Sequence, residues 1–164
     1  MVVGTFPILS EFFIINQITG LIDLGHDVDI LAFKKSSERA VHEDVLKYKL
    51  LERVTYIERV PEFRIQSLWK LTQVIARRFL FHPKAIMAVL NAQRYESRYT
   101  TMDNLFKLNC FLDKKYDVVH CHFGPIANQV IFLKDILPKV KFIAQFHGYD
   151  ISRYVRGKTK SVYK

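Results

Sequence analysis

The stretch of residues 2–33 reads VVGTFPILSEFFIINQITGLIDLGHDVDILAF and carries the pattern that decides the fold. Residues 2–4 are typical of the end of a β-strand, and residues 5–7 predict a turn. Apolar residues then recur at helical spacing, and the apolar run 28–33 predicts a second strand. A strand, a helix and a strand within about 30 residues form a βαβ unit, which requires parallel strands with helices on the faces of the sheet.

Ser10 and Gly25 are expected to bound the helix of this unit. The Ser10 hydroxyl can accept a hydrogen bond from a free backbone N–H of the first turn, and Glu11 favours the positive end of the helix dipole. Gly25 can adopt the left-handed conformation that ends a helix. The apolar stripe between them consists of Ile14, Ile18, Leu21 and Ile22.

The same succession of elements returns near the C-terminal end of the sequence. Strands are expected at Tyr116–Cys121 and Val140–Phe146, with a helix at Ile126–Leu137 between them. A further strand is expected at Val54–Glu58, and helices are expected at Ile65–Phe81 and Lys84–Leu112. The chain thus predicts one α/β domain over residues 1–164, in which the order of the strands stays open and the first strand is short.

Composition places the chain among ordinary globular domains. It has 164 residues, of which 49% are hydrophobic and 25% are charged, and this excludes disordered and collagen-like chains. Two cysteines are too few for a disulfide framework. No apolar run reaches the roughly 18 residues needed to span a bilayer, and no basic leader precedes the first strand. We therefore expect a cytoplasmic protein.

Positive charge is concentrated in the later part of the chain. The formal net charge is +9, whereas residues 1–63 alone carry more acidic than basic side chains. The excess charge is therefore a local surface feature, whose partner could be a phosphate-bearing substrate, an anionic membrane or a nucleic acid.

Residues 65–79 predict a basic amphipathic helix that contains a tryptophan, with Lys70, Arg77 and Arg78 beside its apolar stripe. Such a helix can lie in a membrane interface, although a core-facing helix with a solvated basic back explains the pattern equally well. Tyr95 and Tyr99 stand among arginines, but no RNA- or DNA-binding motif accompanies them, so we expect no nucleic-acid partner.

Three loops are expected at the carboxyl ends of strands, where open α/β sheets bind ligands. These loops are 4–10, 122–125 and 147–150. The first is not a G-x-G-x-x-G loop and gives no dinucleotide signal. Ser10, taken alone, is more typical of a helix cap than of a ligand contact.

Histidines mark the second and third loops. His120 and His122 share one face of their strand, because alternate residues of a strand point the same way. A metal site would need further ligands, and the sequence has no C-x-x-C or H-E-x-x-H motif, so we expect no metal. His122 and His147 each stand beside a glycine, Gly124 or Gly148, that would let the backbone approach a ligand closely.

Asp150 has three possible roles that the sequence leaves open. It is close enough to orient His147, it could accept a hydrogen bond from a sugar hydroxyl, and it could cap a helix.

Three blocks of the sequence together resemble glycosyltransferase family 4, in particular its exopolysaccharide branch. The blocks are FPILSEFFIINQITGLIDLGH at 6–26, DVVHCHFGP at 117–125 and FHGYD at 146–150. They occur in the order in which the family has them and span nearly the whole chain. One departure is Phe12, since relatives commonly carry threonine after Ser-Glu.

The resemblance implies the N-terminal domain of a GT-B enzyme, in which two Rossmann-like domains face each other across a cleft. Such enzymes retain the configuration of the transferred sugar and use neither a metal nor another cofactor. The N-terminal domain mainly holds the saccharide or lipid-linked acceptor, and the C-terminal domain holds the nucleotide sugar. The C-terminal domain, with its two glutamates seven residues apart, has no counterpart here. We therefore expect this chain alone to be inactive.

The resemblance also assigns roles to residues of this chain. His147 is expected to contact the donor sugar, with its backbone carbonyl near the positive charge of the transition state. Asp150 is expected to fix the loop of His147, and Thr5 to approach the donor phosphates. The same cleft would be lined by Ser10, Glu11, His122 and Gly124. The alternative is a non-catalytic α/β module that binds a phosphorylated ligand or a partner protein.

Overall fold

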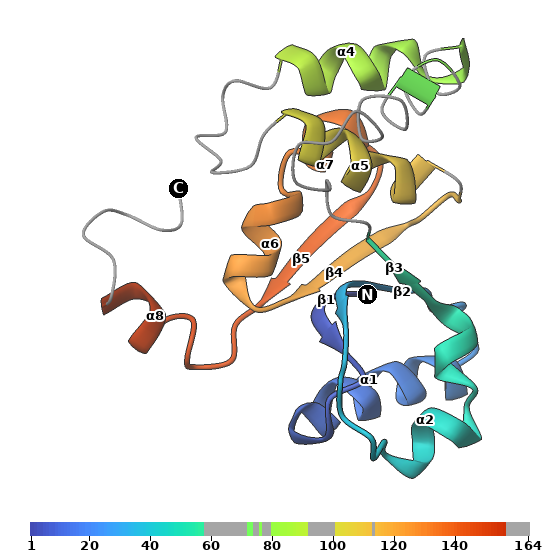
Figure 1. The fold of residues 1–164 in the computed structure, drawn as a ribbon, viewed down its shortest axis with the longest axis vertical. Coiled ribbons are helices and arrows are strands. Elements are labelled where there is room, and N and C mark those ends of the chain that lie inside the picture. Colours follow the sequence, from blue (N-terminus) through green and yellow to red (C-terminus); the bar gives the residue numbers. More distant parts are fainter. Residues whose placement is uncertain (58–71, 74–75, 77–79, 92–100, 113, 157–164) are drawn as a thin grey trace.

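A computed structural model describes residues 1–57, 72–73, 76, 80–91, 101–112 and 114–156, and Figure 1 shows the fold. Its centre is a five-stranded parallel sheet with the order β3-β2-β1-β4-β5. The strands are β1 (Val2–Phe6), β2 (Ile30–Lys35), β3 (Val54–Tyr56), β4 (Val118–His122) and β5 (Lys141–Gln145). The expected Rossmann-like α/β class, a parallel sheet flanked by helices, is confirmed.

Helices cover both faces of the sheet (Figure 1). The described helices are α1 (Phe12–Asp23), α2 (Glu43–Lys47), α4 (Pro83–Asn91), α5 (Thr101–Leu112), α6 (Gly124–Val130), α7 (Leu133–Ile136) and α8 (Arg153–Arg156), with the 3-10 turns η1 (Leu9–Glu11) and η2 (Leu50–Arg53). Among them, none is long and apolar enough to cross a membrane.

Alternation along the strands divides the core into two layers. Val2 and Leu31 pack with residues of α4 to α7 on one face, whereas Val3 and Ile30 pack with α1 and α2 on the other. Successive side chains of a strand point to opposite faces, so a strand buried on both faces is apolar throughout. This explains why the central strands read as continuous apolar runs.

The start of α1 differs from the expectation, because Ser10 does not cap the helix. The turn η1 precedes α1, no side-chain hydrogen bond caps either element, and Ser10 is exposed. The Leu9 N–H is instead bound at 2.9 Å by the carboxylate of Glu38, which follows β2. A distant acceptor thus satisfies a donor at this turn, and the helix begins two residues after Ser10.

The end of α1 is as expected. Gly25 has φ = 85°, its N–H binds the carbonyl of Ile22, and the next N–H, of His26, binds the carbonyl of Leu21. These two bonds form a Schellman motif, which satisfies carbonyls that the helix leaves free.

Several boundaries also differ from the expected ones. β1 continues through Phe6, because Thr5 and Phe6 pair with β2. The helix expected at 126–137 begins at Gly124 and is divided into α6 and α7. Lys70, Arg77, Arg78 and the tyrosines at 95 and 99 lie outside the described residues.

Gly4 lies where α6 packs against β1. A Cβ atom built on Gly4 would meet the Cδ1 atom of Ile126 at 3.4 Å, which is ordinary contact. Gly4→Ala should therefore change the free energy of unfolding by less than about 1 kcal/mol, whereas Gly4→Leu should destabilise the chain by about 1–3 kcal/mol through overpacking. Urea unfolding of the two variants measures the difference, and equal midpoints would contradict this packing.

Candidate ligand-binding site at the carboxyl edge of the sheet

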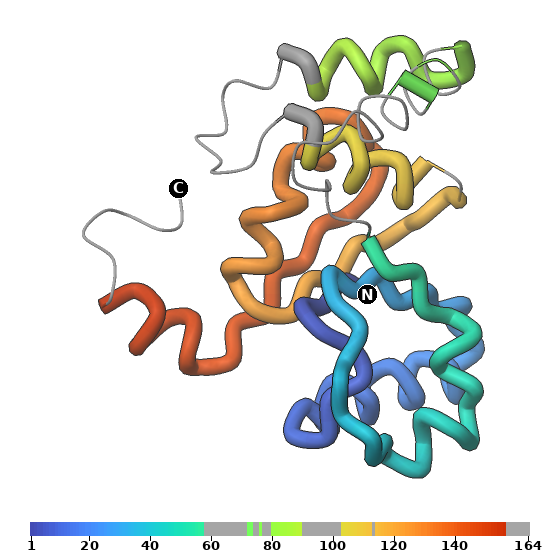
Figure 2. The backbone as a smooth tube through the Cα atoms, in the orientation of Figure 1, coloured from blue at the N-terminus to red at the C-terminus, as the bar shows by residue number. Residues whose placement is uncertain are grey.

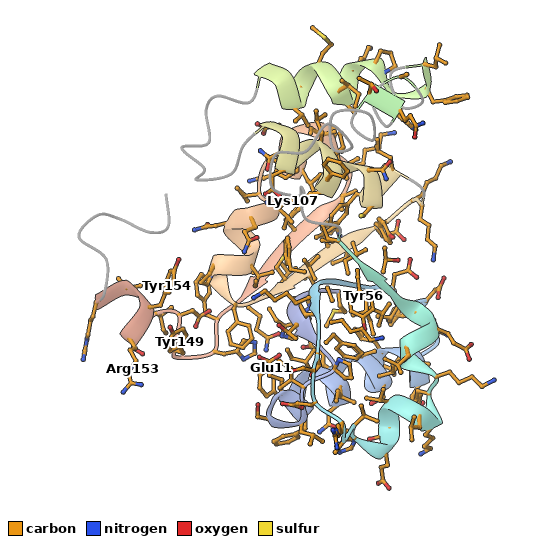
Figure 3. All side chains as sticks on the ribbon, in the orientation of Figure 1. Glu11, Tyr56, Lys107, Tyr149, Arg153 and Tyr154 are labelled. Atoms are coloured by element: carbon orange, nitrogen blue, oxygen red, sulfur yellow. The ribbon has the colours of Figure 1, made fainter. Side chains whose placement is uncertain are left out.

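The segments that leave β1, β4 and β5 meet at one edge of the sheet. Figure 2 shows the chain leaving β5 beside the turn that joins β4 to α6. Figure 3 labels Glu11 and Tyr149, which lie on the segments after β1 and β5 at this edge. Parallel strands end at the same edge, so residues far apart in the sequence become neighbours there.

His122, the last residue of β4, forms a hydrogen bond with His147. Its Nδ1 atom lies 3.0 Å from the Nε2 atom of His147, and the side chain of His122 is 0% exposed. Burial is the main reason why the pKa of His122 falls to about 3, and the neighbouring His120 and His147 lower it further. His122 is therefore neutral at physiological pH, and in this structure it cannot touch a ligand directly.

Two phenylalanines enclose the ring of His147. The ring centroids of Phe13 and Phe123 each lie 4.6 Å from that of His147. Phe13 belongs to α1 and Phe123 precedes α6, so residues from three segments form one aromatic cluster. The sequence reasoning missed both phenylalanines, and the only signal was their position inside the blocks at 6–26 and 117–125.

Phe123 has a strained backbone. Its φ is 71° and its ψ is 132°, a conformation that costs a non-glycine residue about 1–3 kcal/mol. The surrounding bonds hold it there: the Phe123 N–H binds the carbonyl of Gln145, and its carbonyl accepts from Ile126 and Ala127. The strained conformation of Phe123 lets the chain turn sharply between β4 and α6, and the ring of the same residue contacts His147.

Asp150 holds the two loops together. One carboxylate oxygen accepts the N–H of His147 and the other accepts the N–H of Gly124, both at 2.8 Å, and Asp150 is 0% exposed. The carboxylate also lies at the positive end of α6, where a negative charge is favoured. Of the roles left open for Asp150, fixing the loop and capping a helix are both observed. Its burial and these two bonds argue against contact with a sugar hydroxyl.

The two glycines of these loops act differently from each other. Gly124 is buried and its N–H is bound to Asp150, so this N–H is not free to bind a ligand in this structure, and the expected close approach of a ligand to Gly124 stays a prediction. Gly148 has φ = 77°, and a Cβ atom added there would meet nothing within 4 Å. Gly148 thus permits a tight turn in which the Tyr149 N–H binds the carbonyl of His147 at 2.9 Å, beside open space.

Thr5, Ser10 and Glu11 lie on or after β1. Thr5 is within the strand, Ser10 is exposed, and Glu11 is half-buried. Burial, with a smaller contribution from Glu38, raises the pKa of Glu11. Among the described residues, no hydrogen bond joins these three side chains to the histidine pair.

Within the described ranges, no group of three or more His, Cys, Asp or Glu side chains could hold a metal ion. His122 and His147 bond each other through Nδ1 and Nε2, and the expectation that the chain binds no metal stays a prediction.

The fold and this site define an α/β domain whose polar groups converge at the ligand-binding edge of a parallel sheet. The chain is 32% identical over 150 residues to WcaL of Escherichia coli K12 and 31% identical over 153 residues to WcaL of Salmonella typhimurium, both named as colanic acid biosynthesis glycosyltransferases. It is 30% identical over 156 residues to AmsK of Erwinia amylovora, named as an amylovoran biosynthesis glycosyltransferase.

These matches cover 90% of this chain but only 36% to 37% of each relative. No family model and no solved structure matches the chain. The resemblance to exopolysaccharide glycosyltransferases is confirmed over the region that the chain shares with these relatives.

Replacement of Asp150 tests whether its carboxylate holds the loops. Asp150→Ala leaves the buried N–H of Gly124 and the partly buried N–H of His147 without an acceptor, and we expect a loss of about 2–4 kcal/mol in the free energy of unfolding. Urea unfolding measures this loss. Amide hydrogen exchange should also become faster at Gly124 and His147. Unchanged exchange at these two amides would contradict the proposed clamp.

The low pKa of His122 predicts a pH dependence of stability. In the unfolded chain a histidine takes up a proton near pH ~6.5, whereas the folded chain does not protonate His122 until about pH 3. The unfolded state binds more protons between these values, so stability falls as the pH falls through this window, by up to about 1.4 kcal/mol per pH unit.

The control for this pH dependence is His122→Asn, which removes the titrating group. Urea midpoints of the two proteins, measured from pH 7 to pH 4, should converge as the pH falls. Parallel curves over the whole range would show that His122 contributes nothing to the pH dependence.

Proposed function

We propose that this domain forms the acceptor side of a glycosyltransferase active site in exopolysaccharide synthesis. The whole enzyme would move a sugar from a nucleotide-sugar donor to a saccharide or lipid-linked acceptor. The observation that carries the proposal is the cluster of His122, His147 and Asp150 at the carboxyl edge. The names of the relatives support the same reaction class.

His147 is the residue to which we assign contact with the donor sugar. Its ring is held by His122, Phe13 and Phe123, and its backbone N–H is held by Asp150. Its carbonyl accepts one hydrogen bond from Tyr149, and a carbonyl oxygen has a second lone pair. We propose that this lone pair faces the positive charge that develops on the sugar ring as its bond to the nucleotide breaks. A fixed dipole of this kind stabilises a transition state without further reorganisation.

Retention of the sugar configuration and independence from metal ions are further parts of the proposal. They follow from the resemblance to family 4 and agree with a site that is built from a neutral histidine and backbone groups. The nucleotide pocket would lie on a second domain facing this edge, so the 164 residues alone are expected to have no transferase activity.

We also propose that the enzyme works at the cytoplasmic face of the membrane. A net charge of +9 suits contact with anionic lipid headgroups or with a phosphate-bearing acceptor. The residues to which we assign this contact are Lys70, Arg77 and Arg78.

His147→Ala in the complete enzyme tests the main proposal. We expect kcat/KM to fall by about 10²–10³-fold, because alanine removes the imidazole that we assign to the donor sugar and with it the contacts that hold the His147 carbonyl in place. The free energy of unfolding should also fall, by about 1–3 kcal/mol, because the buried His122 loses its hydrogen-bond partner, so turnover is measured on enzyme shown to be folded. Release of nucleoside diphosphate in the presence of acceptor measures turnover.

The matched control is His26→Ala, which removes an exposed histidine just after α1. This variant should keep the wild-type rate. If His147→Ala also keeps it, His147 has no part in the reaction and the assignment of the site fails.

A further inference from the structure

The buried side chain of His122 makes a bond that an apolar residue in its place could not make. Its Nδ1 atom is bonded to His147, but its Nε2 atom is buried and has no hydrogen-bond partner in the part of the chain that the structure describes. A buried polar atom without a partner is unfavourable, and an apolar side chain of the same size would avoid that penalty. The sequence thus keeps a histidine where packing alone would favour leucine or phenylalanine.

The hydrogen bond between the two histidines lies close to the planes of both rings. The two rings are inclined by only 15°, and their centroids are 5.2 Å apart. This separation exceeds the 3.0 Å distance between the bonded nitrogens by about two imidazole ring radii. The bonded nitrogens therefore lie nearly on the line that joins the centroids, which is the geometry of an in-plane hydrogen bond rather than of stacking.

The remaining ring nitrogen of His147 is not fully buried. Its Nε2 atom is used by His122, whereas its Nδ1 atom has no hydrogen-bond partner among the described residues and is not buried. Phe13 and Phe123 flank the ring and oppose its rotation, and Asp150 fixes the backbone of the same residue. The bond to His122, the two phenylalanine contacts and the bond to Asp150 together fix the orientation of the His147 ring.

We propose that His122 is a positioning residue, which acts through His147 by occupying Nε2 so that Nδ1 is the atom presented to the substrate. This inference rests on the proposed function of His147 and assigns His122 a role other than the direct ligand contact expected from the sequence. Because His122 is neutral at working pH, a single proton lies between the two bonded nitrogens, and the bond holds the ring of His147 in one orientation.

Two substitutions of His122 test the role of its hydrogen bond separately from the role of its aromatic ring. His122→Phe keeps an aromatic ring between His120 and His147 but removes the bond, while His122→Asn removes the ring but keeps a polar atom near the position of Nδ1. Two-bond ¹H–¹⁵N spectra of the chain report the protonation of each ring nitrogen. We expect a single tautomer of His147 in the wild type and in His122→Asn. In His122→Phe we expect the two tautomers of His147 to exchange, so that their ring-nitrogen signals are averaged.

A fixed tautomer of His147 in folded His122→Phe would overturn the proposal. If His122→Phe does not fold, a through-bond ¹⁵N–¹⁵N coupling between His122 and His147 is measured in the wild-type chain instead. Such a coupling is expected, and its absence would equally overturn the proposal.

Kinetics of the complete enzyme then separate this inference from the proposed function. We expect His122→Phe to lower kcat by about 10²-fold, with a smaller change in KM, and His122→Asn to restore most of the rate. A slow His147→Ala together with a fully active His122→Phe would refute the positioning role alone. A fully active His147→Ala would refute the proposed function itself.

Discussion

The carboxylate of Asp150 is the constraint on which the site depends. It accepts hydrogen bonds from the backbone of Gly124 and of His147, which belong to different loops, and no water reaches it. Charged acceptors make stronger hydrogen bonds than neutral ones, and they do so most effectively away from solvent. This carboxylate thus anchors both the strained turn at Phe123 and the tight turn at Gly148.

The parts of the site that depend on local patterns could be predicted from the sequence. Apolar runs predicted the strands, and residues at helical spacing between them predicted the crossover helix and hence a parallel sheet. Gly25 predicted the end of α1, where its backbone is left-handed. Alternation along β4 placed His120 and His122 on one face, and their rings do lie together, with centroids 4.9 Å apart. These features follow from backbone geometry over a few residues, so one sequence is enough to predict them.

The features that could not be predicted all depend on contacts between distant segments. The Ser10 side chain could cap a helix, but it is the carboxylate of Glu38 that accepts the Leu9 N–H at the start of η1. The residues around Ser10 in the sequence give no sign of this distant acceptor. Phe13 and Phe123 resemble ordinary core residues until the fold brings both against His147. The order of the strands is unpredictable for the same reason, because every parallel arrangement satisfies the local pattern.

Several unfavourable features of this domain lie beside His147. Phe123 has a strained backbone, His122 carries a buried nitrogen without a partner, and burial keeps that histidine neutral. Each of these lowers stability, and each contacts or orients His147. Selection for folding alone could remove such costs through simple substitutions. Their convergence on one half-buried side chain is what a site requires when its geometry must be ready before the substrate arrives, and this supports placing the chemistry at His147 rather than at the exposed Ser10.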